Sequence, residues 1–261
     1  MPGKNLSREE ARDRAAIIRV ESYRVHLDVS AAADPGRPTF RSTTRISFDC
    51  AEPGATSFAD LLAPEVVSVE LNGLALDPAE VFDGARVALP VLAAHNELTV
   101  VAECAYSRTG EGLHRFVDPA DGETYLYTHY EPADARRVFA NFEQPDLKAP
   151  FAFTVTAPAA WDVYANAVHE KVTADGAART WEFAPTQPIS TYLTAVVAGP
   201  YHVVRDHYSR ELPDGAVLEI PLAATCRRSL APYFDADEIL TVTKQGLDFF
   251  HQEFDYPYPF G

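Results

Sequence analysis

The sequence predicts a mainly β fold built from antiparallel strands, as in a sandwich or a curved sheet. Polar and apolar residues alternate in many short segments, which is the pattern of a half-buried strand. Turn signals rich in Gly, Pro, Asp and Asn separate these segments. The chain also holds 20 Pro, 12 Tyr and 15 Phe, a composition that favours strands and turns over a helical bundle.

The first element expected is a short helix over residues 7–17. Ser7 and Glu10 have the spacing of a capping box, in which each side chain accepts a hydrogen bond from the other residue's backbone N–H. Alternating segments follow and are expected to form strands. They cover residues 23–29, 44–48, 67–71, 86–89 and 98–104.

The middle of the chain begins with an irregular stretch over 107–121 and returns to strands. Asp121 and Gly122 predict a hairpin turn into a strand over 124–128. Residues 191–198 are nearly all apolar, which predicts a strand buried on both faces. Other strands are expected over 151–155, 161–165 and 180–183.

Gly199 and Pro200 predict a boundary, after which two strands and a helix are expected. The strands cover 201–207 and 217–222, on either side of a turn at 213–215. Asp235 has the position of a helix cap, and prolines end the helix before Tyr256. One apolar stripe on the helix is formed by Ile239, Val242, Leu247, Phe250 and Phe254.

Composition and charge exclude several classes of protein. The chain has 22 Lys+Arg and 38 Asp+Glu in 261 residues, a formal charge of −16, and no basic cluster that would bind nucleic acid. Its hydrophobic content of 47% argues against a disordered chain. No apolar run is long enough to span a membrane, and the first residues do not form a secretory signal. Three widely spaced cysteines favour reduced thiols, so we expect a cytoplasmic protein.

Neither a metal site nor a nucleophile stands out in the sequence. The eight histidines lack metal-binding spacing, and no His-Glu-x-x-His motif or nucleophile elbow is present. We therefore expect no catalytic residue and no bound metal in these 261 residues. Cys226 precedes Arg227 and Arg228, which could lower the pKa of its thiol. The alternative reading is a small hydrophobic core residue.

One segment, residues 127–151, combines many polar groups with aromatic side chains. Glu131 lies in it between Tyr130 and Pro132, which predicts a stiff, partly buried carboxylate at the end of a strand. An unpaired buried charge is costly, so this carboxylate needs a cationic partner. The partner is either internal, Arg136 or Arg137, or the ammonium group of a ligand.

The same segment resembles the signature of the aminopeptidase N family of zinc exopeptidases. The matching residues include Glu131-Pro132, Ala135-Arg136 and Lys148-Ala149. Three further stretches resemble the family at the expected order and spacing. They are Gly112–Phe116, Pro188–Leu193 and Tyr256–Gly261.

The resemblance implies a fold and two site residues. Residues 1–198 would form a saddle-shaped β domain with its short leading helix, and 199–261 would open a thermolysin-like catalytic domain. Glu131 matches the family residue that binds the free α-amine of the substrate. His129 stands where the family usually has Gln, which lines the pocket for the first side chain; simple packing is the alternative role. Residues 142–145 depart from the family pattern and are expected to be structural.

The family motifs that supply the zinc ligands and the catalytic base are absent from this sequence. We therefore expect an N-terminal fragment of a zinc-dependent aminopeptidase, inactive alone and binding no catalytic zinc, which the full-length parent would hold. Its expected partners are peptide N-termini and the remainder of the catalytic domain, with no nucleic acid and no membrane. Two alternatives stay open: a non-catalytic β-sandwich interaction module, and a sibling activity of the parent such as epoxide hydrolysis.

Overall fold

A computed structural model describes residues 5–259 of the chain, so Phe260 and Gly261, the end of the Tyr256–Gly261 motif, lie outside it. The chain divides into two compact units. The first comprises the chain up to Val117 together with Thr124–Gly199, and the second comprises Asp118–Glu123 and the chain from Pro200 onward. The assignment of these units to the family's two domains stays a prediction.

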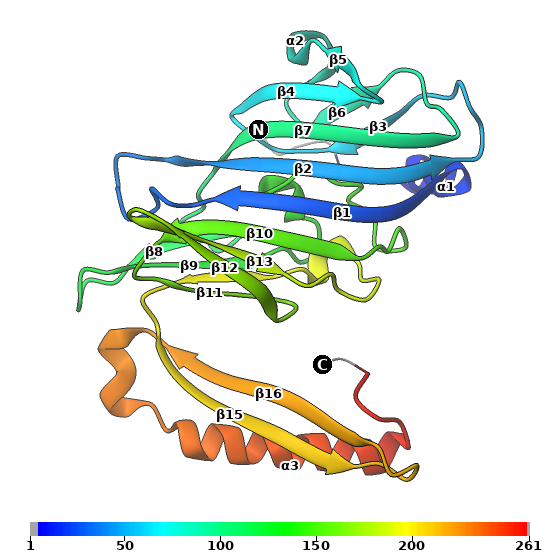
Figure 1. The fold of residues 1–261 in the computed structure, drawn as a ribbon. Coiled ribbons are helices and arrows are strands. Elements are labelled where there is room, and N and C mark those ends of the chain that lie inside the picture. The colour runs from blue at the N-terminus through cyan, green and yellow to red at the C-terminus, as the bar shows by residue number, and fades with distance from the viewer. Residues whose placement is uncertain (1–4, 260–261) are drawn as a thin grey trace. The chain divides into compact units, whose positions relative to one another are not determined.

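The first unit is built from three β-sheets and short helices (Figure 1). Its largest sheet has the strand order β12-β13-β10-β1-β2-β7-β4-β5, and a four-stranded sheet has the order β11-β14-β9-β8. The strands of the large sheet are β1 (Ile18–Asp28), β2 (Thr39–Cys50), β4 (Glu65–Leu71), β5 (Leu74–Leu76), β7 (His95–Ala105), β10 (Phe151–Pro158), β12 (His169–Asp175) and β13 (Ala178–Phe183). Those of the four-stranded sheet are β8 (Gly112–Val117), β9 (Thr124–His129), β11 (Asp162–Ala165) and β14 (Val196–Gly199). The remaining elements of this unit are α1 (Arg8–Ile17), β3 (Ser57–Asp60), α2 (Pro78–Val81), β6 (Arg86–Leu89), and the 3₁₀ turns η1 (Ala135–Arg137) and η2 (Thr191–Leu193).

The predicted mainly β, antiparallel class is confirmed, with one parallel pair inside the large sheet. β1 pairs in parallel with β10, from Tyr23↔Phe151 to Asp28↔Thr156. This pairing joins the beginning of the chain to a strand far along the sequence. It therefore depends on burial of the two strands together and has no local turn to signal it.

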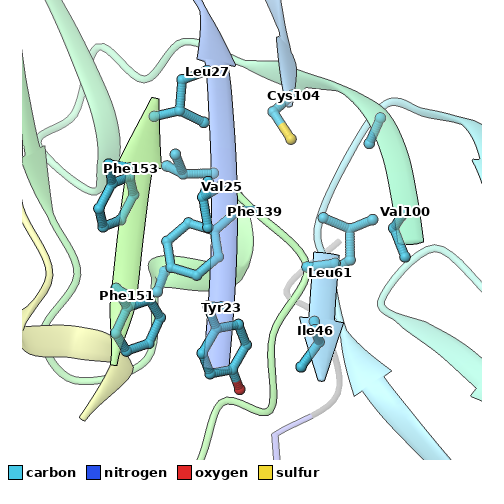
Figure 2. Packing of buried hydrophobic residues seen from close by; sticks show 14 of the residues in the cluster. Tyr23, Val25, Leu27, Ile46, Leu61, Val100, Cys104, Phe139, Phe151 and Phe153 are labelled. Atoms are coloured by element: carbon cyan, nitrogen blue, oxygen red, sulfur yellow. The ribbon is translucent and has the colours of Figure 1, made fainter. Parts of the chain in front are cut away.

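The core lies on the inner face of the large sheet. In β1 the buried residues Tyr23, Val25 and Leu27 alternate with exposed ones, as the sequence pattern predicts. Figure 2 shows these side chains beside Phe151 and Phe153 of β10. The Tyr23 and Phe151 rings stack with centroids 4.4 Å apart. Apolar burial of this kind, about 1.5–3 kcal/mol per large side chain, is the main stabilising contribution to the unit.

Helix α1 begins at the predicted capping box. The Ser7 hydroxyl accepts from Glu10 N at 3.2 Å, and the Glu10 carboxylate accepts from Ser7 N at 2.9 Å. The same carboxylate accepts two hydrogen bonds from the Arg86 guanidinium, at 2.6 and 3.1 Å. These bonds from Arg86 are the main cause that lowers the pKa of Glu10 to about 2.

The prediction of one continuous strand over residues 191–198 is wrong in its first half. Thr191–Leu193 form the turn η2, and only Val196–Gly199 form a strand. The Thr194 hydroxyl donates to Thr191 O at 2.7 Å, which stabilises the turn locally. Hydroxyl side chains compete with strand pairing in this way, so the apolar character of the run was misleading.

The second unit consists of a two-stranded sheet and helices. Its elements are β15 (His202–Glu211), β16 (Val217–Cys226), η3 (Arg228–Tyr233) and α3 (Ala236–Phe254). Ala236 and Leu240 of α3 pack against Ala224 of β16. Segment Asp118–Glu123 joins this unit through Asp118, whose carboxylate accepts from Arg227 at 2.8 Å.

The apolar stripe expected on α3 is not a buried face in this structure. Ile239, Val242, Phe250 and Phe254 are each exposed, between 45% and 68%, and Leu247 is half-buried. The helix instead packs through Ala236 and Leu240 near its start.

Candidate functional site

The two residues predicted to bind substrate lie where β9 leaves its sheet. β9 is held on both sides, by β8 through Gly112↔His129 and by β14 through Tyr127↔Val197. Tyr130, the next residue, is buried and packs edge-on against the Phe139 ring. His129 and Glu131 flank this anchor and are both exposed. A fixed strand end thus presents the two side chains at the surface.

The backbone at Glu131 is held by a tight turn. Asp134 N donates to Tyr130 O at 2.8 Å, closing the turn that contains Glu131 and Pro132. The Glu131–Pro132 peptide bond is cis. The proline ring restricts the backbone angle φ at this point. The predicted position of Glu131 at the end of a strand is therefore confirmed, and its main chain is fixed on both sides.

The expectation that Glu131 is partly buried is wrong, because its side chain is exposed. Within residues 5–259 it makes no hydrogen bond or ion pair, and neither predicted internal partner reaches it. Arg136 Nε donates to Ala133 O at 3.0 Å, and Arg137 Nε donates to Asp134 Oδ1 at 2.5 Å. An exposed carboxylate keeps its hydration, which removes the electrostatic need for an internal partner. The carboxylate is left available to a ligand.

His129 is also exposed, so its ring is not buried in the core. It is the last residue of β9, two residues before Glu131 in the chain. An imidazole is both a hydrogen-bond donor and an acceptor. The strand end therefore exposes one anionic and one polar aromatic side chain.

A buried polar cluster supports the loop that follows Glu131. Arg136 N donates to the Glu143 carboxylate at 2.7 Å, and the Thr191 hydroxyl donates to its other oxygen at 2.5 Å. Glu143 N in turn donates to Asp60 Oδ2 at 3.0 Å. Burial raises the pKa of Glu143 to about 7, and the Asp60 carboxylate adds to this effect. Residues 142–145 are therefore structural, as expected.

Helix α1 is fixed to the same cluster through Arg14, which is only 3% exposed. Its Nη1 lies 2.8 Å from Asp60 Oδ2, and its Nε donates to Gln144 Oε1 at 3.0 Å. The guanidinium also lies over the Phe142 ring, 5.6 Å from the centroid. Sequence reasoning did not identify Arg14, Asp60 or Glu143 as a group. Their separation along the chain leaves no local pattern that would reveal them.

A cavity of about 350 Å³ lies beside the β8–β9 hairpin, and neither Glu131 nor His129 lines it. It contains one carboxylate, that of Glu111. Thr109 donates to this carboxylate, and its hydroxyl is the main cause that lowers the pKa of Glu111. The Ser107 hydroxyl lies 3.5 Å from the same oxygen. Because Glu111 is already bound by its own loop, Glu131 is the better candidate for an incoming cation.

Zinc chemistry does not fit the residues described. Between residues 5 and 259, no group of three or more His, Cys, Asp or Glu side chains is placed to hold a metal ion. Cys226 does not have the activated thiol considered from its arginine neighbours, because burial raises the pKa of the thiol. We derive no catalytic step from a metal or from this cysteine. Among the described helices, none is long and apolar enough to cross a membrane.

The known proteins that this chain matches all point to one family. Residues 88–193, which include His129 and Glu131, match the Peptidase M1 N-terminal domain. The chain is 54% identical over its whole length to aminopeptidase N of Streptomyces lividans, covering 29% of that protein. It is 30% identical over 79% of its length to a probable M1 family aminopeptidase of Encephalitozoon cuniculi, covering 25% of that protein.

A more distant relative agrees with these two. The chain is 27% identical over 73% of its length to a probable aminopeptidase of Sulfurisphaera tokodaii, of which it covers 24%. The chain thus spans less than a third of the length of each of these relatives. The matched domain, the identity over the full chain and the β architecture lead to one conclusion: the chain belongs to the aminopeptidase N family and corresponds to its N-terminal portion.

Proposed function

We propose that this chain is part of a zinc-dependent aminopeptidase that releases N-terminal residues from peptides, and that Glu131 binds the substrate's free α-amine. The observation that carries the proposal is an exposed, unpaired carboxylate on a fixed turn, within the segment that matches the M1 N-terminal domain. The named relatives are aminopeptidases, which supports the reaction class.

The chemistry of an exopeptidase requires this kind of group. A carboxylate that accepts charge-assisted hydrogen bonds from an ammonium group distinguishes a free N-terminus from an internal peptide bond. A rigid anchor also fixes the distance from the terminus to the reacting bond. Glu131 meets both conditions, because no internal cation occupies it and the turn holds its backbone. His129 would contact the first residue of the substrate.

The remainder of a catalytic domain is the proposed partner of the second unit. Phe249, Phe250 and Phe254 of α3 are more than half exposed, as is Tyr256. Exposed apolar side chains clustered on one helix mark a surface that another part of a protein covers. In this proposal the covering segment also supplies the base that activates water and the zinc site, for which the described residues hold no group of ligands.

The experiment is a product analysis with the longer protein that we propose contains this chain. We expect it to release single residues from the N-terminus of a peptide and to leave the same peptide intact once its α-amine is acetylated. The purified 261-residue chain should hydrolyse no aminoacyl anilide, even with zinc added. Release of internal fragments, or equal cleavage of the acetylated peptide, would contradict the proposal. An inactive longer protein would instead favour a binding module.

A further inference from the structure

The outer face of the large sheet carries a shallow hollow of about 160 Å³, which neither Glu131 nor His129 lines. It spans the four adjacent strands β10, β1, β2 and β7 (Figure 1). We call it the arginine hollow. Its polar lining consists of Arg24, His26, Thr43, Arg45, Thr99 and Thr154.

Two arginines face each other across the hollow. Arg24 of β1 is the direct register partner of Arg45 of β2. Facing residues in an antiparallel pair have Cβ atoms about 4.5–5.5 Å apart, and like charges at this position are destabilising. Arg45 Nε lies 3.4 Å from Glu97 Oε1. Arg24 makes no hydrogen bond or ion pair with any described residue, so one positive charge of the pair is not compensated.

Hydroxyl groups complete a ring of donors around these charges. The register places Thr99 opposite Arg45, Thr43 opposite His26, and Thr154 beside His26. In the described chain these three threonine side chains make no hydrogen bond, so all three hydroxyls are available to donate. His26 Nε2 lies 2.9 Å from the hydroxyl of Thr156, which holds the imidazole in place.

Other arginines on the same face are neutralised by carboxylates. Arg41 of β2 pairs with Glu103 at 2.8 Å, and Arg19 of β1 pairs with Asp49 at 3.2 Å. In a chain of charge −16, the Arg24–Arg45 pair forms one ion pair, with Glu97, while Glu70 and Glu182 lie at the rim of the hollow, opposite Thr99 and Thr154. Its two guanidinium groups and three free hydroxyls are all hydrogen-bond donors, which suits an anion with several oxygens.

We propose that the arginine hollow binds a phosphate group, either the free ion or a monoester on a small molecule. Guanidinium groups bind phosphate oxygens through paired, charge-assisted hydrogen bonds, and the opposite charges of the two groups add to the attraction. A bound dianion between Arg24 and Arg45 also removes their mutual repulsion. The three hydroxyls then donate to the remaining oxygens.

The test is calorimetric titration of the full chain at constant ionic strength. Inorganic phosphate is the probe in one arm and glycerol phosphate in the other. We expect saturable binding in at least one arm, and the tighter arm identifies the source of the phosphate. Arg24→Gln and Arg45→Gln should each raise the Kd by about tenfold or more, as expected for loss of a charge-assisted contact.

The matched control is Arg41→Gln, on the same face of β2 but paired with Glu103. It should change the Kd by less than about twofold, since a neutralised charge outside the hollow is screened. Tryptophan fluorescence of each variant reports whether it is folded. No saturable binding in either arm, an unchanged Kd in both hollow variants, or an equal effect of Arg41→Gln would each overturn the proposal.

Discussion

Burial of the Glu143 carboxylate predicts how the free energy of unfolding changes with pH. Its pKa is raised from the ordinary 4.5 to about 7, first by burial. Between these two values the folded chain binds a proton that the unfolded chain has released. The slope of stability with pH follows the protons bound by the unfolded state minus those bound by the folded state, so it is negative here. Glu143 therefore costs stability as the pH rises through this window.

The substitution Glu143→Gln removes this titration and preserves the hydrogen bonds. The amide oxygen can accept from Arg136 N. The amide nitrogen can donate to the Thr191 hydroxyl, which then acts as an acceptor in place of a donor. A difference of about 2.5 pKa units corresponds to about 3 kcal/mol, an upper bound for the change between pH 4.5 and 7. Relative to wild type, the variant should gain up to that amount over this range and remain constant above it.

Urea unfolding followed by tryptophan fluorescence measures this difference. The chain has two tryptophans, Trp161 and Trp181, and both are buried in the unit that contains Glu143. Unfolding curves at pH 5, 6, 7 and 8 give the free energy of unfolding of wild type and variant. Glu170→Gln, at an exposed position of β12, is the control. Its free energy of unfolding should change with pH in the same way as that of wild type. A difference between wild type and Glu143→Gln that does not vary with pH would refute the reasoning.

Two further changes test how the cluster and the hairpin are held. Arg14→Met leaves the buried Asp60 carboxylate without its cation, so it should lower the free energy of unfolding by about 3–5 kcal/mol in the same urea assay. A loss below about 1 kcal/mol would show that the ion pair contributes little to stability. Gly112→Ala should cost about 1–3 kcal/mol, because Gly112 has φ +64° and an added Cβ would lie 3.0 Å from Arg137 Cβ; an unchanged thermal midpoint would contradict this close packing.

Local patterns in the sequence predicted the elements well because their causes are local. Alternation of polar and apolar residues identified the main strands, and the spacing of Ser7 and Glu10 identified the start of α1. The turn at Asp121 and Gly122 was predicted for the same reason, since Gly122 adopts a positive φ of 72°. Each of these signals lies within a few residues of the structure that it specifies.

Features that depend on distant contacts could not be predicted in this way. The parallel pairing of β1 with β10 and the cluster of Arg14 with Asp60 join segments far apart in the chain. The position of Glu131 at a strand end followed from its neighbours, but its exposure did not. Burial depends on what packs around a side chain, and here Tyr130 takes the inward position.

The role of Glu131 is the central claim, and steady-state kinetics of the longer protein test it most directly. Glu131→Gln keeps the shape of the side chain and removes its charge. For a substrate with a free α-amine, kcat/KM should fall by about 10²-fold or more, the scale of a lost charged contact. Glu170→Gln should leave it unchanged. A kcat/KM close to wild type for Glu131→Gln would contradict the assignment of this carboxylate as the amine anchor.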